Sequence, residues 1–140
     1  MKIVIPGDNE APSWNELMKN VMFTMAVRDT TILIAPHHGR EAGFCEELLD
    51  LMSPKLVVIS DGDACDTSAT SRYSAKAVGC RVANGLGTVE TRKCVTTRKD
   101  GHITLKLGLN NTVPSFWAST SKPLPSLIPP PSFASILAGK

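Results

Sequence analysis

Short runs of β-branched and apolar residues, separated by stretches with helical spacing, constrain the fold of this chain most. Lys2–Ile5, Thr31–Ala35 and Leu56–Ser60 are the clearest of these runs, and each predicts a strand. The stretches between them, 13–26 and 41–51, place apolar residues on one helical face and predict helices. Because strands that alternate with helices usually form a parallel sheet covered by those helices, we expect a layered α/β domain.

The helix boundaries follow from capping patterns. Ser13 with Glu16 three residues later forms a capping box, which predicts one helix running to about Ala26. The next helix should turn Phe44 and Leu48 inward, with Leu51 on the same face. A shorter helix is expected over 71–78.

The part beyond Gly79 reads as mainly β. Strands are expected at 81–83, 88–97 and 102–107. Lys99-Asp100-Gly101 predicts a hairpin turn before the last of them, since Asp-Gly readily supplies the positive backbone torsions of such turns. The sequence therefore predicts one folded domain over residues 1–109.

The last thirty residues differ in composition. Six of the ten prolines lie between Asn111 and Lys140, together with many serines. Proline fixes φ and removes a hydrogen-bond donor, so residues 110–140 are expected to be a Pro/Ser-rich flexible tail that joins neither a helix nor an inner strand. Phe116-Trp117 is apolar enough to dock on a surface, and a proline-rich ligand for an aromatic groove is the alternative.

Charge and length exclude several classes of protein. Fifteen Lys and Arg against thirteen Asp and Glu exclude nucleic-acid binding driven by the net charge of the whole chain, but not a local basic patch. The apolar runs are far shorter than the ~20 residues of a membrane span, and no signal-peptide pattern opens the chain. The four cysteines form no Cys-x-x-Cys pair. We therefore expect free thiols in a soluble, cytoplasmic protein with no membrane partner.

Metal-type ligands follow the predicted strands. Asp8 lies in the loop 6–10, His37 and His38 in the loop 36–39, and further carboxylates in the loop 60–63. Parallel strands would bring these loops to one edge of the sheet, and imidazole with carboxylate suits zinc, iron or manganese. Paired histidines between Pro and Gly are the stronger signal, because Gly-Asp after a strand is commonly only a turn.

Other polar groups have two interpretations each. The acidic residues Asp61, Asp63 and Asp66 either bind a cation or form a polar loop with Asx turns, and His102 is expected to be solvated. Five basic residues along the β end either contact phosphates or form a solvated hairpin face. They are Arg81, Arg92, Lys93, Arg98 and Lys99.

A family resemblance appears at the same residues. The segment Ile32-Leu33-Ile34-Ala35-Pro36-His37-His38-Gly39, with Pro54–Ser60 after the next helix, resembles the C-terminal half of metallo-β-lactamase-fold hydrolases of the DNA-competence (ComEC-like) type. Gly7-Asp8 followed by a helix with Trp14 is similar to the Gly-Asp motif of that family. The resemblance covers roughly residues 1–107, including Arg72-Tyr73-Ser74, Arg92–Arg98, Asp100-Gly101 and Ile103.

The resemblance implies a fold, a cofactor and a chemistry. The fold would be a layered half of a metallo-β-lactamase-like αββα sandwich, with a mixed sheet and flanking helices. Zn²⁺ or Mn²⁺ would be held by Asp8 and His38, with His37 as neighbour or alternative ligand. A metal-bound hydroxide would then attack a phosphodiester, as in nucleic-acid hydrolysis, so Asp8 and His38 would be the catalytic residues.

The chain also departs from the family pattern. It contains no His-x-His-x-Asp-His run, which in the family precedes the Gly-Asp motif and supplies the main metal ligands. Two functions are therefore expected. The first is a truncated or split metal-dependent hydrolase, inactive until a partner chain supplies the N-terminal half or a homodimer forms. The alternative is a non-catalytic binding protein of the same fold, with nucleic acid as a candidate partner.

Overall fold

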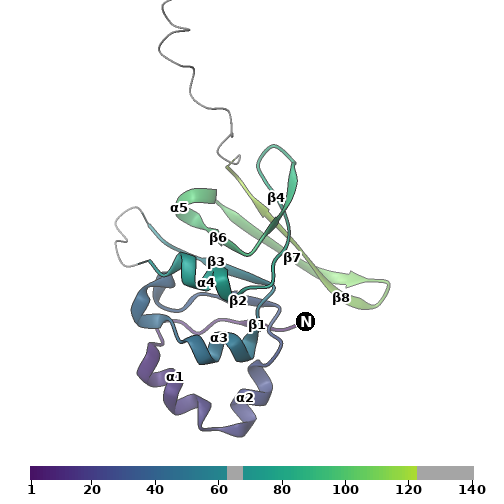
Figure 1. The fold of residues 1–140 in the computed structure, drawn as a ribbon. Coiled ribbons are helices and arrows are strands. Elements are labelled where there is room, and N and C mark those ends of the chain that lie inside the picture. Colours follow the sequence, from purple (N-terminus) through teal and green to yellow (C-terminus); the bar gives the residue numbers. More distant parts are fainter. Residues whose placement is uncertain (63–67, 123–140) are drawn as a thin grey trace, which may run out of the picture.

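The computed structural model describes residues 1–62 and 68–122 of the 140-residue chain. These residues form three layers: helices, a four-stranded parallel sheet and a second four-stranded sheet (Figure 1). The predicted layered α/β class with flanking helices is confirmed. Two separate apolar clusters hold the layers together, one on each face of the parallel sheet.

The parallel sheet is the central layer. Its strands are β1 (Ile3–Val4), β2 (Ile32–Ile34), β3 (Leu56–Ile59) and β6 (Cys94–Thr96), in the order β1-β2-β3-β6 and all parallel. Alternate residues of β3 enter opposite clusters, since side chains of a strand point to its two faces in turn. Leu56 and Val58 face the second sheet, whereas Val57 and Ile59 face the helices. This two-sided burial explains the continuous apolar runs in the sequence.

Four helices pack against one face of this sheet. They are α1 (Ala11–Met18), α2 (Val21–Val27), α3 (Glu46–Met52) and α4 (Thr70–Lys76). The prediction of one helix over 13–26 is wrong, because the chain turns between Met18 and Val21. The Asn20 side chain accepts hydrogen bonds from the amides of Met22 and Phe23, and so caps a second helix.

The helix predicted over 41–51 is also shorter than expected. Two short turns precede it: η1 (Pro36–Gly39), in which His37 and His38 have non-helical backbone torsions, and η2 (Glu41–Gly43), a single turn of 3₁₀ helix. Phe44 and Leu48 are buried as predicted, while Leu51 is only partly buried. The helix α4 lies where a short helix was expected and buries Tyr73.

The second sheet covers the other face of the parallel sheet. It contains β4 (Cys80–Ala83), β5 (Val89–Arg92), β7 (Ile103–Asn110) and β8 (Val113–Thr120), in the order β5-β4-β8-β7. The single strand expected at 88–97 is therefore wrong: β5 belongs to this sheet, and β6 belongs to the parallel one. Lys93 separates the two strands.

The expected hairpin turn at Lys99-Asp100-Gly101 is wrong as well. Residues Thr97–Asp100 form a helical turn, α5, which is capped by the Thr96 hydroxyl and ends at Gly101 with φ 74°. A tight hairpin does not fit here, because β6 and β7 lie in different sheets and do not pair.

The predicted tail contains a strand. β8 lies between β4 and β7, and its Ala118 is fully buried, so residues 113–120 are folded and the proposed domain boundary at 109 is wrong. Pro114 fits because it pairs only with β7; the contact with β4 begins further along, at Ala118. Residues 123–140 of the predicted tail lie outside the described part.

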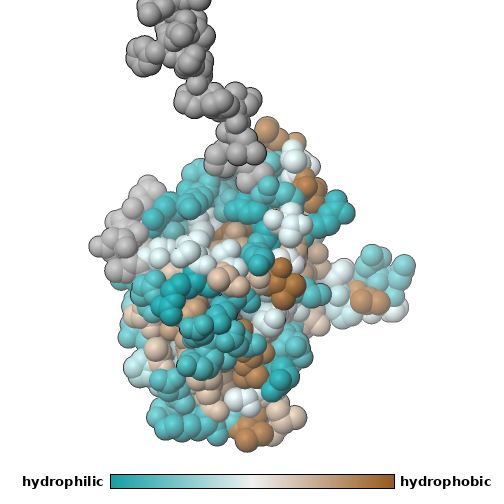
Figure 2. Space-filling model, in the orientation of Figure 1, coloured by the Kyte–Doolittle hydropathy of each residue, from teal (hydrophilic) through white to brown (hydrophobic). Residues whose placement is uncertain are grey.

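The turn end of β7 and β8 projects from the body as an arm (Figures 1 and 2). Leu107, Leu109 and Val113 are exposed on it. Among residues 1–62 and 68–122, no helix has the length and apolar character needed to cross a membrane.

Candidate functional site

The loops predicted to carry the chemistry do meet at one edge of the parallel sheet. The strands β1, β2 and β3 all run in the same direction, so the residues that follow them lie at a common edge, which we call the carboxyl edge. The His37 amide donates a 3.0 Å hydrogen bond to the Gly7 carbonyl, which ties the first loop to the second. The predicted convergence of these loops is confirmed at the level of the backbone.

The histidine loop has an unusual backbone. His37 and His38 have φ of 46° and 55°, and Gly39 continues with φ 73°. Non-glycine residues in this region are strained by roughly 1–2 kcal/mol each, and such strain concentrates at functional sites. The core fixes the loop from below, since a Cβ on Gly39 would lie 2.6 Å from Cγ2 of Ile59.

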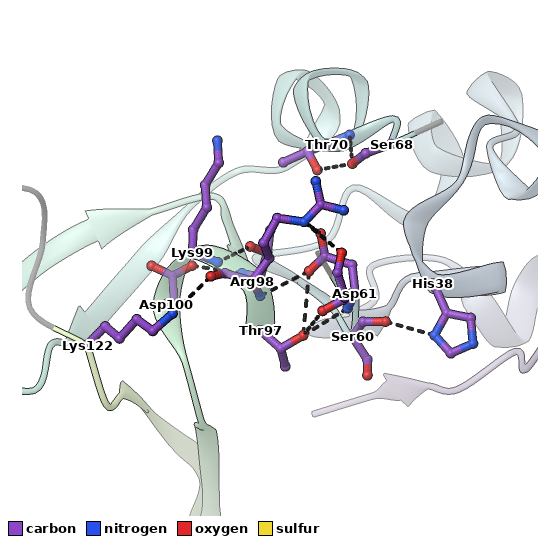
Figure 3. Close-up of polar contacts among 12 residues, drawn as sticks. His38, Ser60, Asp61, Ser68, Thr70, Thr97, Arg98, Lys99, Asp100 and Lys122 are labelled. Atoms are coloured by element: carbon purple, nitrogen blue, oxygen red, sulfur yellow. Dashed lines mark hydrogen bonds and ion pairs between the residues drawn. The ribbon is translucent and has the colours of Figure 1, made fainter. Parts of the chain in front are cut away.

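His38 is held in one orientation by the third loop. Its Nδ1 lies 2.7 Å from the carbonyl oxygen of Ser60, the residue after β3 (Figure 3). A carbonyl oxygen can only accept a hydrogen bond, so Nδ1 carries the hydrogen and the neutral ring leaves the lone pair of Nε2 available. Histidine ligands of metals are commonly oriented in this way, by a backbone carbonyl behind the ring.

His37 meets a different carboxylate from the predicted one. Its Nδ1 lies 2.8 Å from Oε1 of Glu10, a contact that lacks hydrogen-bond geometry and is an ion pair only when the imidazole carries a proton on both nitrogens. Asp8 is exposed in the turn of the same loop. Glu10 was visible in the sequence as part of this acidic loop, but nothing in the spacing distinguished it from Asp8.

The predicted ligands do not make a complete metal site by themselves. Among residues 1–62 and 68–122, no three His, Cys, Asp or Glu side chains are grouped so that they could hold a metal ion. A catalytic zinc needs three protein ligands and an open position. His38 therefore fits the orientation of a ligand, whereas the described part of the chain supplies too few groups for a full centre. Asp63 and Asp66 lie outside the described residues.

Asp61 is a structural anchor and not part of a solvated loop. Its side chain is only 3% exposed and lies 3.3 Å from Nε of Arg98. Its amide donates to the Thr97 hydroxyl, and that hydroxyl donates back to the Asp61 carbonyl (Figure 3). The loop after β3 is thereby fastened to α5, and the expectation of a simple polar loop is wrong for this residue.

A second buried carboxylate, Asp100, is the last residue of α5. Both oxygens of Asp100 accept hydrogen bonds from Nη2 of Arg92, and Oδ2 also accepts from the Thr96 amide. Each of the two buried aspartates is thus paired with an arginine of the β end. The sequence did not reveal these pairs, because the partners are 8 residues apart in one pair, with the whole of β6 between them, and 37 residues apart in the other.

Between these two pairs lies a cavity of about 690 Å³. Its walls are α4 on one side and the segment from Thr91 to Asp100 on the other, and we call it the α4–α5 cavity. Its lining is Asp61, Ser68, Thr70, Ser71, Ser74, Thr91, Arg92, Lys93, Cys94, Thr96, Arg98, Lys99 and Asp100. Four of the five basic residues singled out in the sequence therefore share one cavity, and Arg81 is not among them.

The thiol in this lining is not an activated nucleophile. Burial raises the pKa of Cys94 to about 12, although the nearby Arg92 acts in the opposite direction. Burial also raises the pKa of Cys45 and Cys80. All three are free thiols, as the sequence predicted for the cysteines. A nucleophilic cysteine needs a lowered pKa, so none of these three is suited to covalent catalysis.

Comparison with known proteins adds no relative. Neither the protein-family models, the curated proteins nor the solved structures contain a match to this chain.

Proposed function

We propose that this chain carries one part of a metal-dependent phosphoester hydrolase site and is inactive alone. The supporting observation is His38, held by the Ser60 carbonyl at 2.7 Å, at the edge where loops of a parallel sheet collect. Its strained backbone is fixed by the core beneath Gly39, which is costly to maintain for a loop without a role. Zn²⁺ or Mn²⁺ is the proposed metal, with His37 and Asp8 as the neighbouring candidate ligands.

The missing ligands are proposed to come from a partner. An N-terminal-half chain or a second copy would complete the site. Exposed apolar side chains on α2, Val21, Met22 and Met25, provide surface for such an association. The free, unactivated thiols are compatible with a reducing compartment, so we propose the cytoplasm as its location.

Metal content of the purified chain tests this proposal. After incubation with Zn²⁺ or Mn²⁺ and gel filtration, the wild type should retain metal, and His38→Ala should retain much less. His102→Ala is the matched control, because His102 is an exposed histidine just before β7 and outside the site. Equal retention by wild type and His38→Ala would show that the proposed ligand is wrong.

A phosphodiester assay tests the claim of incompleteness. The isolated chain should not turn over bis-p-nitrophenyl phosphate with added metal. Robust turnover that His38→Ala abolishes would contradict the need for a partner.

The second candidate is a non-catalytic binding protein, for which nucleic acid is the proposed partner. One observation favours it: the described residues assemble a basic cavity more fully than a metal centre. Sedimentation velocity together with metal content separates the two functions. A dimer with stoichiometric metal supports the split hydrolase, and a metal-free monomer supports the binding protein.

A further inference from the structure

The α4–α5 cavity has the size and position of a ligand site. Its volume of about 690 Å³ is within the roughly 300–1,000 Å³ of small-molecule pockets. It opens beside the carboxyl edge, since Asp61 follows β3 and Thr96 ends β6. In sheets of this kind, ligands bind outside the carboxyl ends of the strands.

The charges of the lining favour an anion. Four cationic side chains face two carboxylates. Both carboxylates are buried and paired, Asp100 with Arg92 and Asp61 with Arg98. Lys93 and Lys99 are exposed, and neither forms an ion pair with any carboxylate of residues 1–62 or 68–122. Counted over the described lining residues, the cavity therefore has two positive charges in excess, both on lysines.

The opposite wall supplies hydrogen-bond donors. Thr70 and Ser74 lie four residues apart on α4, so their hydroxyls occupy the same face of the helix, and Ser71 lies beside them. Ser68 and Thr70 share a hydrogen bond that orients their hydroxyls, and the Arg98 side chain extends toward this pair (Figure 3). Hydroxyls and ammonium groups are the donors that phosphate oxygens accept from.

The lining also limits which part of a ligand is recognised. Among residues 1–62 and 68–122, the lining contains no aromatic side chain. Proteins that hold unpaired bases stack them on aromatic rings, whereas phosphate contacts need only charge and donors. We infer that the α4–α5 cavity binds the phosphate group of a nucleotide or nucleic-acid strand through Lys93, Lys99 and the α4 hydroxyls, without reading the base.

This inference rests on the second candidate function, the binding protein, whose ligand chemistry it specifies, and it does not depend on the proposed metal site. The phosphate-binding residues are distinct from His37, His38 and Asp8. Loss of metal binding would therefore leave phosphate binding in place, and failure of either proposal can be recognised separately by including His38→Ala.

The experiment uses the full chain with two probes. Calorimetry measures inorganic phosphate, and fluorescence anisotropy measures a labelled oligothymidylate and an oligodeoxyadenylate of equal length at several salt concentrations between about 50 and 200 mM. The test variant is Lys93→Gln/Lys99→Gln. The matched control is Lys55→Gln/Lys106→Gln, which removes the same charge from exposed lysines outside the cavity.

We expect both probes to bind to the wild type and the control, and both oligonucleotides to bind alike. The test variant should lose about tenfold or more in affinity, and its salt slope should decrease by roughly 1.4, about 0.7 for each lost cation on a single strand. Phosphate binding without oligonucleotide binding would support the cavity and identify a free small phosphate as the source. Absence of binding, equal losses in test and control variants, or a strong preference for one base would overturn the inference.

Discussion

The Ser60 carbonyl oxygen lies 2.7 Å from Nδ1 of His38, while the next residue, Asp61, is locked to Thr97 on the other side. One dipeptide at the end of β3 therefore supports both the histidine loop and the α4–α5 cavity. A backbone hydrogen bond also connects the histidine loop to the cavity wall: the Gly39 carbonyl accepts from the amide of Ala69, just before α4. The two candidate sites share a single rigid edge.

The rigidity of the histidine loop can be tested at Gly39. We expect Gly39→Ala to destabilise the chain by about 2–4 kcal/mol, because the new Cβ would meet Ile59 and φ is positive. Gly7→Ala is the matched control: φ is also positive, at 63°, but no atom lies within 4 Å of the added Cβ. It should cost only about 1 kcal/mol. Urea unfolding measures both, and equal losses would show that the contact with Ile59 does not constrain the loop.

The anchor between β3 and α5 should contribute measurably to stability. Asp61→Ala removes a nearly buried carboxylate and leaves Arg98, which is partly exposed, without that partner. We expect a loss of about 1–3 kcal/mol, less than for a fully buried pair because solvent reaches the guanidinium. Asp50→Ala on α3, whose exposed carboxylate pairs with Lys76, should cost under about 1 kcal/mol. Chemical denaturation at neutral pH compares them, and similar small losses would contradict the anchoring role of Asp61.

Buried thiols should make the chain sensitive to alkaline pH. Burial raises the pKa of Cys94 from the usual 9.0 to about 12, so the unfolded chain loses this proton at a lower pH than the folded chain. Stability should therefore be unaffected well below pH 9 and should fall as pH rises from 9 toward 12. The Cys94→Ala variant should lose less stability over this interval. Unfolding curves at pH values on both sides of 9 test this, and parallel pH profiles would rule out Cys94 as a cause.

The folding of residues 113–120 can be tested with two neighbours of opposite exposure. Ala118 is fully buried between the sheets, and Trp117 beside it is 49% exposed. Ala118→Asp should cost about 3 kcal/mol or more, because it places an unpaired charge in the core. Trp117→Asn should cost far less. Thermal unfolding of both variants is the measurement; equal tolerance would restore the view of this segment as a tail.

The strands of the central layer were predictable, because burial on both faces requires continuous apolar runs in the sequence. β2 and β3 are apolar on both faces and β-branched, and few other structures accept such runs. The split at Lys93 was not predictable, since nothing in a continuous β pattern marks where one strand leaves for another sheet. β8 was missed because Pro114 argues against a strand, and only the register shows that it pairs on one side.

The candidate site was predictable in its position and not in its contacts. Parallel order follows from alternating strands and helices, so the meeting of the loops could be expected. The partner of His38 is a backbone carbonyl, which every residue carries and no motif encodes. The partner of Asp61 lies 36 residues further on, at Thr97, and their hydrogen bonds depend on the pairing of β3 with β6.

The place of β8 has a consequence for synthesis on the ribosome. The parallel sheet has all its strands once Thr96 has emerged, but β4 and β7 are joined only by β8, which is complete at Thr120. Until then, the apolar surface formed by Ile32, Leu56 and Val58 lacks the part of its cover that β7 and β8 supply. A nascent chain paused in this interval would expose an apolar face of its parallel sheet. Chaperones near the exit tunnel shield surfaces of this kind from aggregation.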